Sequence, residues 1–357
     1  MDFDFADVLI EVMERGASDL HLTAGAPPMV RERGKLSALD YPELDGVTVR
    51  EIVYSILTND QRQRLETDWQ IDLAYSIPGR ARFRVNAYFQ RAALGAAFRL
   101  IPQTMPKLEE LGLPAQIREF TKKPRGFVLV TGPTGSGKST TLAAMIDLIN
   151  AERAEHIMTI EDPIEFLHGH KRCIINQREV GGDAKSFALA LKAALRQDPD
   201  VILVGEMRDL DTISTALTAA ETGHLVFATL HTQDTAQTID RIVDVFPPTQ
   251  QHQVRVQLSV ALQGIVTQQL LPTADGTSRI AATEVLVPTS AVRNLIREGK
   301  THQVYSTLQT GATHGMQTMD ASLADLVRRN KITRELAEAR SSSPEELRRL
   351  MGAVRVA

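Results

Sequence analysis

The residues Gly132–Thr140 fit the phosphate-binding pattern G-x-x-x-x-G-K-[ST] at every fixed position. In this pattern the glycines let backbone N–H groups turn toward an anion, and the following helix presents the positive end of its dipole. The amine of Lys138 can reach the β- and γ-phosphates of a nucleotide, and the hydroxyl of Ser139 can ligate magnesium. The pattern predicts a nucleotide site, with an ordinary Gly-rich turn as the alternative. Its members are Gly132, Pro133, Thr134, Gly135, Ser136, Gly137, Lys138, Ser139 and Thr140.

The segments around this loop indicate how it is held. An apolar, strand-like run, Phe127–Val130, precedes the loop, and a helical pattern, Thr141–Ile149, follows it. Three more apolar runs occur later, separated by segments with helical patterns. This alternation predicts a mainly parallel sheet flanked by helices, with the carboxyl ends of its strands at one edge. The later runs are Ile157–Ile160, Val201–Val204 and Leu225–Leu230.

Carboxylates follow two of these runs. Phosphoryl transfer to water needs magnesium, an acidic group that holds it, and a carboxylate that orients or deprotonates the water. Glu206 follows the third run and is the candidate magnesium ligand, directly or through a metal-bound water. Glu161, Asp162 and Glu165 follow the second run, and spacing does not choose the water activator among them. A solvent-exposed loop acid is the alternative for each.

Two histidines flank the fourth run. His231 follows it, at the predicted active edge, where an imidazole can donate a hydrogen bond to a γ-phosphate. His224 precedes the same run. A purely structural role is the alternative for both.

Arginines are concentrated near the end of the N-terminal part of the chain. In ring assemblies, ATP hydrolysis is often completed by an arginine of a neighbouring subunit. A charged, solvated face is the alternative for any one of them. They are Arg80, Arg82, Arg84, Arg91 and Arg99.

The organisation of the chain predicts two domains, since 357 residues with 43% hydrophobic content can build two ordinary cores. Residues 1–100 predict a small α+β domain, with helical patterns near its start and at 49–57 and strands at 82–89 and 94–100. The segment 101–114 contains Pro102, Pro106, Gly112 and Pro114 and predicts a linker. Residues 115–357 hold the parallel sheet. Within them, apolar residues from Val254 to Leu271 have helical spacing, and 341–357 predict a loosely docked helix.

Composition excludes several classes of protein. The net charge of −4 and a pI near 6.2 argue against bulk nucleic-acid binding. The single Cys173 excludes an internal disulfide and a Cys-rich zinc site, and it indicates the cytoplasm. No apolar run approaches the roughly 18 residues of a membrane helix, and the acidic start lacks the features of a signal peptide. Any membrane role is therefore expected to come through a partner.

Four motifs in fixed order resemble the secretion ATPase superfamily, and within it the ATPases that retract type IV pili. They are GPTGSGKST (132–140), TIEDPIE (159–165), QDPDVILVGEMRD (197–209) and TAAETGHLVFATLHT (218–232). The segments Ser18–His21 and Ala291–Glu298 also resemble signatures of these ATPases. The resemblance covers nearly the whole chain. Conservative departures occur at Ala228 and Val292, and Arg91-Ala92-Ala93 stands where Asn-Arg-Gly is expected, which puts a role for Arg91 in doubt.

The resemblance implies an α/β fold, with a RecA-like P-loop ATPase domain and a smaller N-terminal PAS-like α+β domain. It implies ATP and Mg²⁺ as ligands, and a cytoplasmic homohexamer beneath an inner-membrane pilus platform protein. A second retraction ATPase is a further expected partner, whereas nucleic acid and direct membrane insertion are not expected. The implied activity is ATP hydrolysis that drives pilus retraction and twitching motility.

The resemblance also implies roles for individual residues. Glu165 corresponds to the catalytic carboxylate, Glu206 to the residue that supports magnesium, and His224 and His231 to the histidines of the family. Arginines contributed across a subunit interface correspond best to Arg84 and Arg99, with Arg82 as a substitute.

Four other functions are considered beside retraction. An accessory retraction ATPase shares the core motifs, and the segment Ala291–Glu298 argues against it. Pilus-extension and type II secretion ATPases usually carry a four-Cys insertion, which a chain with one cysteine does not have. A nucleic-acid translocase would show DNA-stimulated turnover. A nucleotide-sensing scaffold would bind ATP without hydrolysing it.

Overall fold

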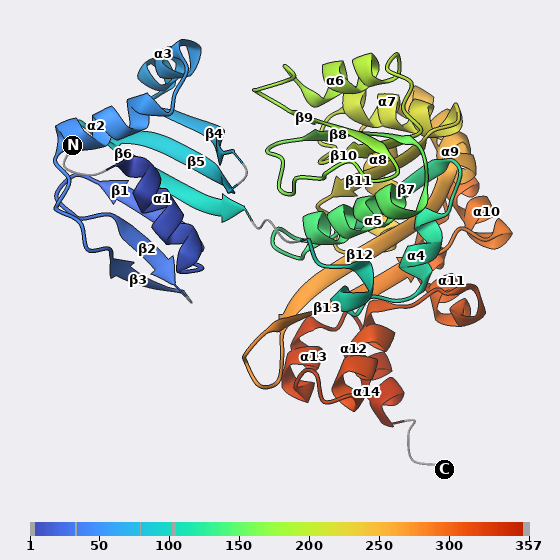
Figure 1. Ribbon diagram of the computed structural model, residues 1–357. Coiled ribbons are helices and arrows are strands. Elements are labelled where there is room, and N and C mark those ends of the chain that lie inside the picture. Colours follow the sequence, from blue (N-terminus) through green and yellow to red (C-terminus); the bar gives the residue numbers. More distant parts are fainter. Residues whose placement is uncertain (1–3, 33, 79, 102–104, 353–357) are drawn as a thin grey trace. The chain divides into compact units, whose positions relative to one another are not determined.

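The computed structural model describes residues 4–32, 34–78, 80–101 and 105–352. The chain forms two compact units (Figure 1). The first comprises residues 1–104 together with 165–167, and the second comprises 105–164 and 168–357. The linker expected at 101–114 contains the short 3-10 helix η1 (Leu108–Leu111), whereas Pro102 lies outside the described residues.

The first unit is built on an antiparallel sheet with the strand order β3-β2-β1-β6-β5-β4. Apolar side chains alternate along the central strands, so one face of the sheet packs on helices α1 and α2. The ring centroids of Phe5 on α1 and Phe98 on β6 are 5.4 Å apart. The helices are α1 (Phe5–Glu14), α2 (Gly46–Ser55) and α3 (Asn59–Asp68), and the strands are β1 (Asp19–Thr23), β2 (Met29–Glu32), β3 (Lys35–Ala38), β4 (Gln70–Ile77), β5 (Ala81–Gln90) and β6 (Ala93–Ile101).

The second unit is built on a sheet with the order β13-β12-β7-β11-β10-β8-β9, parallel except for the antiparallel pair β12 and β13. The four apolar runs of the sequence are β7, β8, β10 and β11, and they are neighbours in this sheet. The prediction of a mainly parallel sheet is therefore confirmed. The strands are β7 (Gly126–Thr131), β8 (His156–Glu161), β9 (Ile174–Glu179), β10 (Val201–Val204), β11 (Leu225–Leu230), β12 (Leu262–Pro272) and β13 (Arg279–Leu286).

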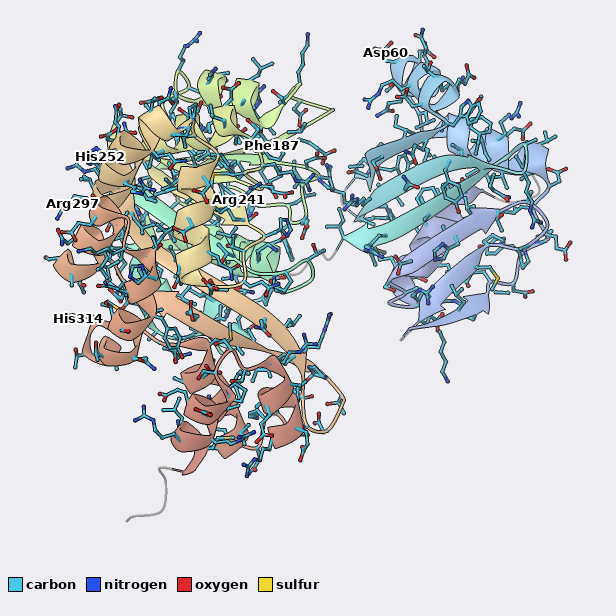
Figure 2. All side chains as sticks on the ribbon, turned by 180° about the vertical axis from the view of Figure 1, so that it is seen from behind. Asp60, Phe187, Arg241, His252, Arg297 and His314 are labelled. Carbon is cyan, nitrogen blue, oxygen red and sulfur yellow. The ribbon has the colours of Figure 1, made fainter. Side chains whose placement is uncertain are left out.

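Helices cover both faces of this sheet, which explains why its central strands are continuously apolar. Helices α4 (Gln116–Thr121) and α5 (Lys138–Glu152) pack on one face. The other face is covered by α6 (Phe187–Ala194), α7 (Leu210–Glu221), α8 (Thr235–Asp244), α9 (Pro248–Ala261) and α10 (Ser290–Glu298). Figure 2 labels Arg241, His252 and Arg297 on α8, α9 and α10.

The segment from Val254 to Leu271 is not one helix, so that prediction is wrong. Helix α9 ends at Ala261 and strand β12 begins at Leu262. The apolar side chains of a strand buried on both faces do not alternate, and here their spacing imitates a helix. The pairing of β12 with β7 is irregular between Leu262 and Gly264, where the ring of Phe120 packs against the backbone.

The guanidinium of Arg293 on α10 closes the C-terminal end of α9. It donates hydrogen bonds to the carbonyl oxygens of Ser259, Val260 and Leu262, the last two at 2.9 Å. Burial lowers the pKa of Arg293 from its usual value. This arginine of the segment Ala291–Glu298 thereby satisfies carbonyls that the end of a helix leaves without partners.

Helices α12 (Met319–Arg328), α13 (Arg334–Arg340) and α14 (Pro344–Gly352) form a small cluster around the far end of the β12–β13 hairpin, with Leu271, Leu323 and Leu347 in its core. Helix α11 (Val304–Thr310), with the 3-10 helices η2 (Thr301–Gln303) and η3 (Ala312–His314) beside it, packs instead near α8 and α10, where Val304 and Leu308 are buried. The helix predicted in the tail is therefore present as α14, and residues 353–357 lie outside the described residues. None of the helices within the described ranges combines the length and the apolar character that crossing a membrane requires.

The single cysteine of the chain is buried beneath α5. The side chain of Cys173 is 2% exposed, and its Sγ lies 3.1 Å from the carbonyl oxygen of Arg153. Burial raises the pKa of the thiol above its usual value.

Candidate active site

The phosphate-binding loop connects β7 to α5, as the sequence predicts. Gly132, Gly135 and Gly137 have φ angles of 135°, 78° and 86°, a region that side chains other than glycine rarely adopt. Gly137 directly precedes the first turn of α5. The loop therefore presents the N-terminus of a helix to the edge of the sheet, where an anion is favoured.

Lys138 and Ser136 fit a phosphate group in this loop. The amine of Lys138 donates hydrogen bonds to the carbonyl oxygens of Gly132 and Pro133, at 2.8 and 3.0 Å, so the side chain folds back over the loop. Ser136 Oγ is buried and has no hydrogen-bond partner among the described residues. A cation held over the loop and an unsatisfied buried hydroxyl suit an anionic ligand with several acceptor oxygens.

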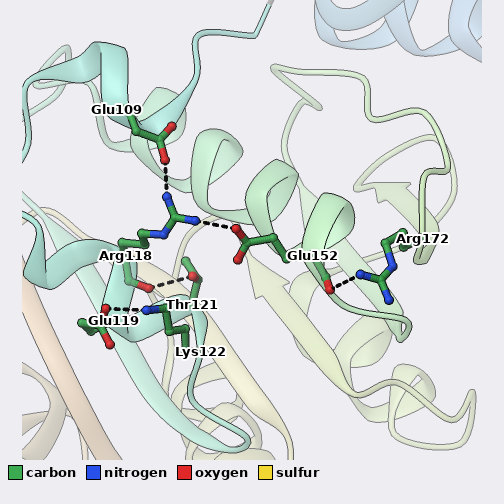
Figure 3. Close-up of polar contacts among 7 residues, drawn as sticks. All are labelled: Glu109, Arg118, Glu119, Thr121, Lys122, Glu152 and Arg172. Atoms are coloured by element: carbon green, nitrogen blue, oxygen red, sulfur yellow. Dashed lines mark hydrogen bonds and ion pairs between the residues drawn. The ribbon is translucent and has the colours of Figure 1, made fainter.

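The other end of the loop's helix is fixed by charged side chains (Figure 3). The guanidinium of Arg118 on α4 lies 2.5 Å from Glu109 of η1 and 2.5 Å from Glu152, the last residue of α5. Arg172 donates a 2.8 Å hydrogen bond to the carbonyl oxygen of Glu152. Such half-exposed ion pairs contribute only about 0.2–1 kcal/mol each. They orient α5 more than they stabilise the fold.

Glu206 and His231 meet at the carboxyl edge of the sheet. His231 Nε2 lies 3.0 Å from Glu206 Oε1, and Arg208 Nε lies 2.5 Å from the same oxygen. Hydrogen bonding to Glu206 raises the pKa of Arg208. The side chain of Arg208 is 78% exposed and that of Glu206 is 21% exposed, so the carboxylate is the fixed member of this group.

Backbone hydrogen bonds hold the ends of β8, β10 and β11 together. The amide of Gly205 donates to the carbonyl oxygen of Ile160 at 2.8 Å, and that of Met207 donates to Thr229 at 3.1 Å. A Cβ on Gly205 would lie 3.2 Å from the Cα of Glu161, so a larger residue would push these strand ends apart. The predicted gathering of Glu161, Glu206 and His231 at one edge is thereby observed in the second unit.

The three acids after β8 differ in their surroundings. Glu161 is half-buried and accepts hydrogen bonds from Thr159 Oγ1 at 2.7 Å and Gln177 Nε2 at 3.3 Å. Asp162 is exposed and contributes to the raised pKa of Arg208. Glu165 is exposed and lies in the segment 165–167, which is grouped with the first unit.

His224 lies at the opposite end of β11 from His231. Its Nδ1 is 2.9 Å from the carbonyl oxygen of Ala219 at the end of α7. Since β11 runs from Leu225 to Leu230, a strand of about 20 Å separates the two histidines. Within one chain, the structure does not bring His224 to the phosphate-binding loop.

In the first unit, Arg82, Arg84 and Arg99 lie on the sheet face that α1 and α2 leave uncovered, whereas Arg80 and Arg91 lie in the turns on either side of β5. Arg84 is directly opposite Arg99, and Arg99 is opposite Asp19 on the next strand. Arg99 Nε donates a 2.9 Å hydrogen bond to Asp19, while the Arg99 side chain remains 72% exposed. Arg84 is exposed, and Arg82 follows the same alternation along β5.

The row formed by Arg82, Arg84, Arg99 and Asp19 on this face carries more positive than negative charge. Although burial raises it, the pKa of Asp19 is held below its usual value by hydrogen bonds from Ser18 and Arg99. One ionised carboxylate thus faces two guanidinium groups, and like charges directly opposite on a sheet repel. An anion beside Arg84 and Arg99 would relieve this repulsion.

Sequence reasoning missed a line of buried hydroxyls behind the loop. Thr131 Oγ1 at the end of β7 lies 2.8 Å from Thr267 Oγ1 on β12 and 3.5 Å from Thr238 Oγ1 on α8. Thr238 Oγ1 is 2.6 Å from Thr232 Oγ1, next to His231. Threonines within or next to apolar runs are the sequence signal for such hydroxyls. The signal is not specific, because threonine is common in strands generally.

An interior parallel strand that leads into this loop, with a carboxylate and an imidazole paired at neighbouring strand ends, defines the class of P-loop ATPases. A family model described as "Type II/IV secretion system protein" matches residues 4–354. The chain belongs to this family of secretion ATPases.

Individual members of the family are similar over nearly the full chain. The type IV pilus retraction ATPase PilT of Pseudomonas aeruginosa is 51% identical over 96% of this chain and 99% of its own length. The type IV pilus ATPase PilU of the same organism is 42% identical over 97% of this chain and 90% of its own. A crystal structure of the pilus retraction motor PilT with bound ADP superposes with a TM-score of 0.91 and 52% identity, covering 97% of this chain and 99% of that one.

Proposed function

We propose that this protein is a hexameric motor that hydrolyses ATP to ADP and phosphate and uses the energy to retract type IV pili. The observation that carries the proposal is the 3.0 Å contact of Glu206 with His231 at the sheet edge to which β7 and its phosphate-binding loop also lead, in a chain 51% identical to a retraction ATPase. Retraction withdraws pilin subunits from the base of the fibre and produces twitching motility.

ATP binds in the loop Gly132–Thr140, with its phosphates against the backbone N–H groups and the amine of Lys138. Ser139 and Glu206 are the residues that would hold Mg²⁺, and the ion would supply positive charge beside the phosphates. Glu206 would do so through a water molecule, because its Oε1 already contacts His231 and Arg208. His231 is positioned to donate a hydrogen bond to the γ-phosphate.

Glu165 is the proposed general base that activates water. Glu161 is engaged by Thr159 and Gln177, which favours an acid further along the segment. Glu165 is exposed and corresponds to the last glutamate of the family's TIEDPIE motif. His224 lies at the far end of β11, so it is not assigned a role at the loop of its own chain.

The arginine row of the first unit completes the site of a neighbouring subunit. Arg84 and Arg99 are exposed, positively charged in excess and aligned by strand register, which is the arrangement a trans-acting anion clamp needs. Arg82 is the substitute. This assignment requires an assembly of several chains, for which a homohexameric ring is proposed.

The proposed organisation assigns residues 1–100 to a PAS-like domain, 101–114 to a linker and 115–357 to the RecA-like ATPase domain with its C-terminal helices. The ring works in the cytoplasm beneath an inner-membrane platform protein, with a second retraction ATPase as a further partner. Nucleic acid is not a partner, and DNA-stimulated ATPase activity would contradict this.

Two substitutions test the chemistry. Lys138→Ala removes the cation that binds the phosphates, and Glu165→Gln removes the base while keeping the shape of the side chain. Each is expected to lower phosphate release at least about 100-fold, with nucleotide binding retained in Glu165→Gln. A purified Glu165→Gln protein that turns over ATP near the wild-type rate would contradict the assignment of Glu165 as the general base.

The alternatives are separated by the phenotype of a deletion strain. Loss of a retraction motor leaves surface pili in place or increases them and abolishes twitching. Loss of all pili would indicate an extension ATPase. Twitching that persists at reduced force would indicate an accessory, PilU-like role.

A further inference from the structure

We propose that Gln268 is a positioning residue that sets the shape of the phosphate-binding loop and thereby the affinity for ATP. Gln268 lies on β12, outside the four motifs of the sequence, and its side chain is 1% exposed. The inference rests on the proposed ATPase function and deepens it, because it adds a residue to the nucleotide site.

The location of Gln268 follows from the pairing of β12 with β7. The last paired residues are Thr267 and Thr131, so β12 continues beyond the point where β7 turns into the loop. Gln268 is the first residue of this overhang. On the side of β7 it therefore lies beside the loop, whereas on its other side it pairs with Thr283 of β13.

The amide of Gln268 joins the loop to the first turn of α5. Its Nε2 donates a 2.7 Å hydrogen bond to the carbonyl oxygen of Ser136, and its Oε1 accepts a 3.0 Å hydrogen bond from Thr141 Oγ1. Both partners lie within a few residues of Lys138. One side chain thus fixes the loop before the lysine and the helix after it.

Two glycines of the loop leave space for this strand. A Cβ on Gly132 would lie 2.2 Å from the carbonyl oxygen of Gln268, and one on Gly137 would lie 3.1 Å from Gln268 Nε2. At both positions φ is also positive. Glycine is therefore required at Gly132 by the close approach of β12 as well as by the conformation of the loop.

These contacts bear on binding more than on the chemical step. The carbonyl of Ser136 accepts the hydrogen bond from Gln268, so the N–H of the same planar peptide, which belongs to Gly137, points the opposite way, where a phosphate can accept from it. Without the Gln268 donor, the buried carbonyl of Ser136 loses its hydrogen bond. The loop then lowers its free energy by rotating that peptide until the carbonyl finds another donor. A rotated peptide would present an oxygen where the phosphates need a hydrogen-bond donor.

Gln268→Met in the full-length chain is the direct test, because methionine has a similar volume and neither hydrogen bond. The KM for ATP is expected to rise about tenfold with kcat changed less than about threefold, and the Kd of a fluorescent ATP analogue is expected to rise in parallel. The matched control is Gln269→Met on the same strand, where the side chain is half-exposed and KM should stay within about twofold.

A second substitution keeps the test decisive if Gln268→Met does not fold. Thr141→Val removes only the hydrogen bond to Gln268 Oε1 and should raise KM about threefold. In the double variant the two effects should be less than additive, since they remove one shared contact. A KM equal to wild type in both single variants, or a lower melting temperature without a change in KM, would overturn the proposal. Such a result in an active wild-type enzyme would leave the proposed ATPase function intact.

Discussion

The carboxyl edge of the seven-stranded sheet and the open face of the six-stranded sheet both gather charged side chains, but by different means. At the edge, Glu206 and His231 meet because parallel strands end together. On the face, Arg84, Arg99 and Asp19 align because antiparallel strands pair in one register. At the edge, an acid lies within hydrogen-bond distance of potential donors. On the face, two arginines share a single carboxylate.

The difference indicates a division of roles. The edge has a buried lysine, an unsatisfied hydroxyl in its loop and a supporting layer of hydrogen bonds, so it can bind a ligand within one chain. The face has exposed guanidinium groups that are aligned by the register of paired strands. It is suited to meet an anion that another molecule presents.

The largest expected effect separates these two roles directly. Arg99→Ala should lower ATP turnover by about 10³-fold while ATP binding stays within a few-fold, because a trans arginine acts on the transition state. Lys138→Ala should lose both ATP turnover and ATP binding. Mixing the two inactive chains should restore a fraction of the turnover, since some sites then combine an intact loop with an intact arginine. Phosphate release from equimolar mixtures measures this.

The mixing experiment also has an outcome that would contradict the proposed role of Arg99. If mixtures stay as inactive as either variant although mixed rings form, Arg99 does not act across chains. A mixture of Arg99→Ala with Arg84→Ala serves as the control, because both variants alter the same face and neither supplies an intact row.

A stability test asks whether the two units are independent. Gly264→Ala would place a Cβ 2.3 Å from the ring of Phe120, inside the core of the second unit. Overpacking of this kind costs about 1–3 kcal/mol, which corresponds to a fall in melting temperature of roughly 5 °C for a unit of this size. Differential scanning calorimetry should show the shift in only one transition. A partial recovery in Gly264→Ala with Phe120→Leu would locate the clash.

The smallest expected effect is a pH dependence confined to the second unit. Burial lowers the pKa of His168 to about 4, from 6.5 in an unfolded chain. Between these values the unfolded state binds more protons, so stability falls as the pH falls from 7.5 to 5.5, by about 1.3 kcal/mol. The melting temperature of this unit should drop by about 3–5 °C over that range.

His168→Gln is the matched variant for the pH test. Glutamine cannot be protonated in this range, so its transition should lose that part of the pH dependence. An unchanged pH profile in His168→Gln would mean that another group is responsible. The pKa of Asp19 in the first unit is already low, so its ionisation does not change between pH 7.5 and 5.5.

The edge could be predicted from the sequence more fully than the face. Short, continuously apolar runs such as Val201–Val204 mark strands buried on both sides, and the residue after such a run lies at the edge of the sheet. The sequence therefore predicts the positions of the phosphate-binding loop, Glu206 and His231 along the chain.

The remaining features of the two sites depend on which strands pair and in which register, and local sequence patterns do not encode this. Alternation along β5 indicates which residues share a face with Arg84, but the partner Arg99 follows from the register with β6. The apolar spacing of β12 fits both a helix and a buried strand, so the sequence predicts a helix there and the prediction is wrong. Gln268 lies in that strand, and its contacts with the loop follow only from the strand order.

The buried thiol described above has a practical consequence for following motion in this protein. Because Cys173 is 2% exposed and its pKa is raised, maleimide and nitroxide reagents should react with it slowly. A single reporter cysteine placed on the surface of each unit would then be labelled selectively, without first replacing the native residue. Distances between two such labels, with and without ATP, would report whether the units move during turnover.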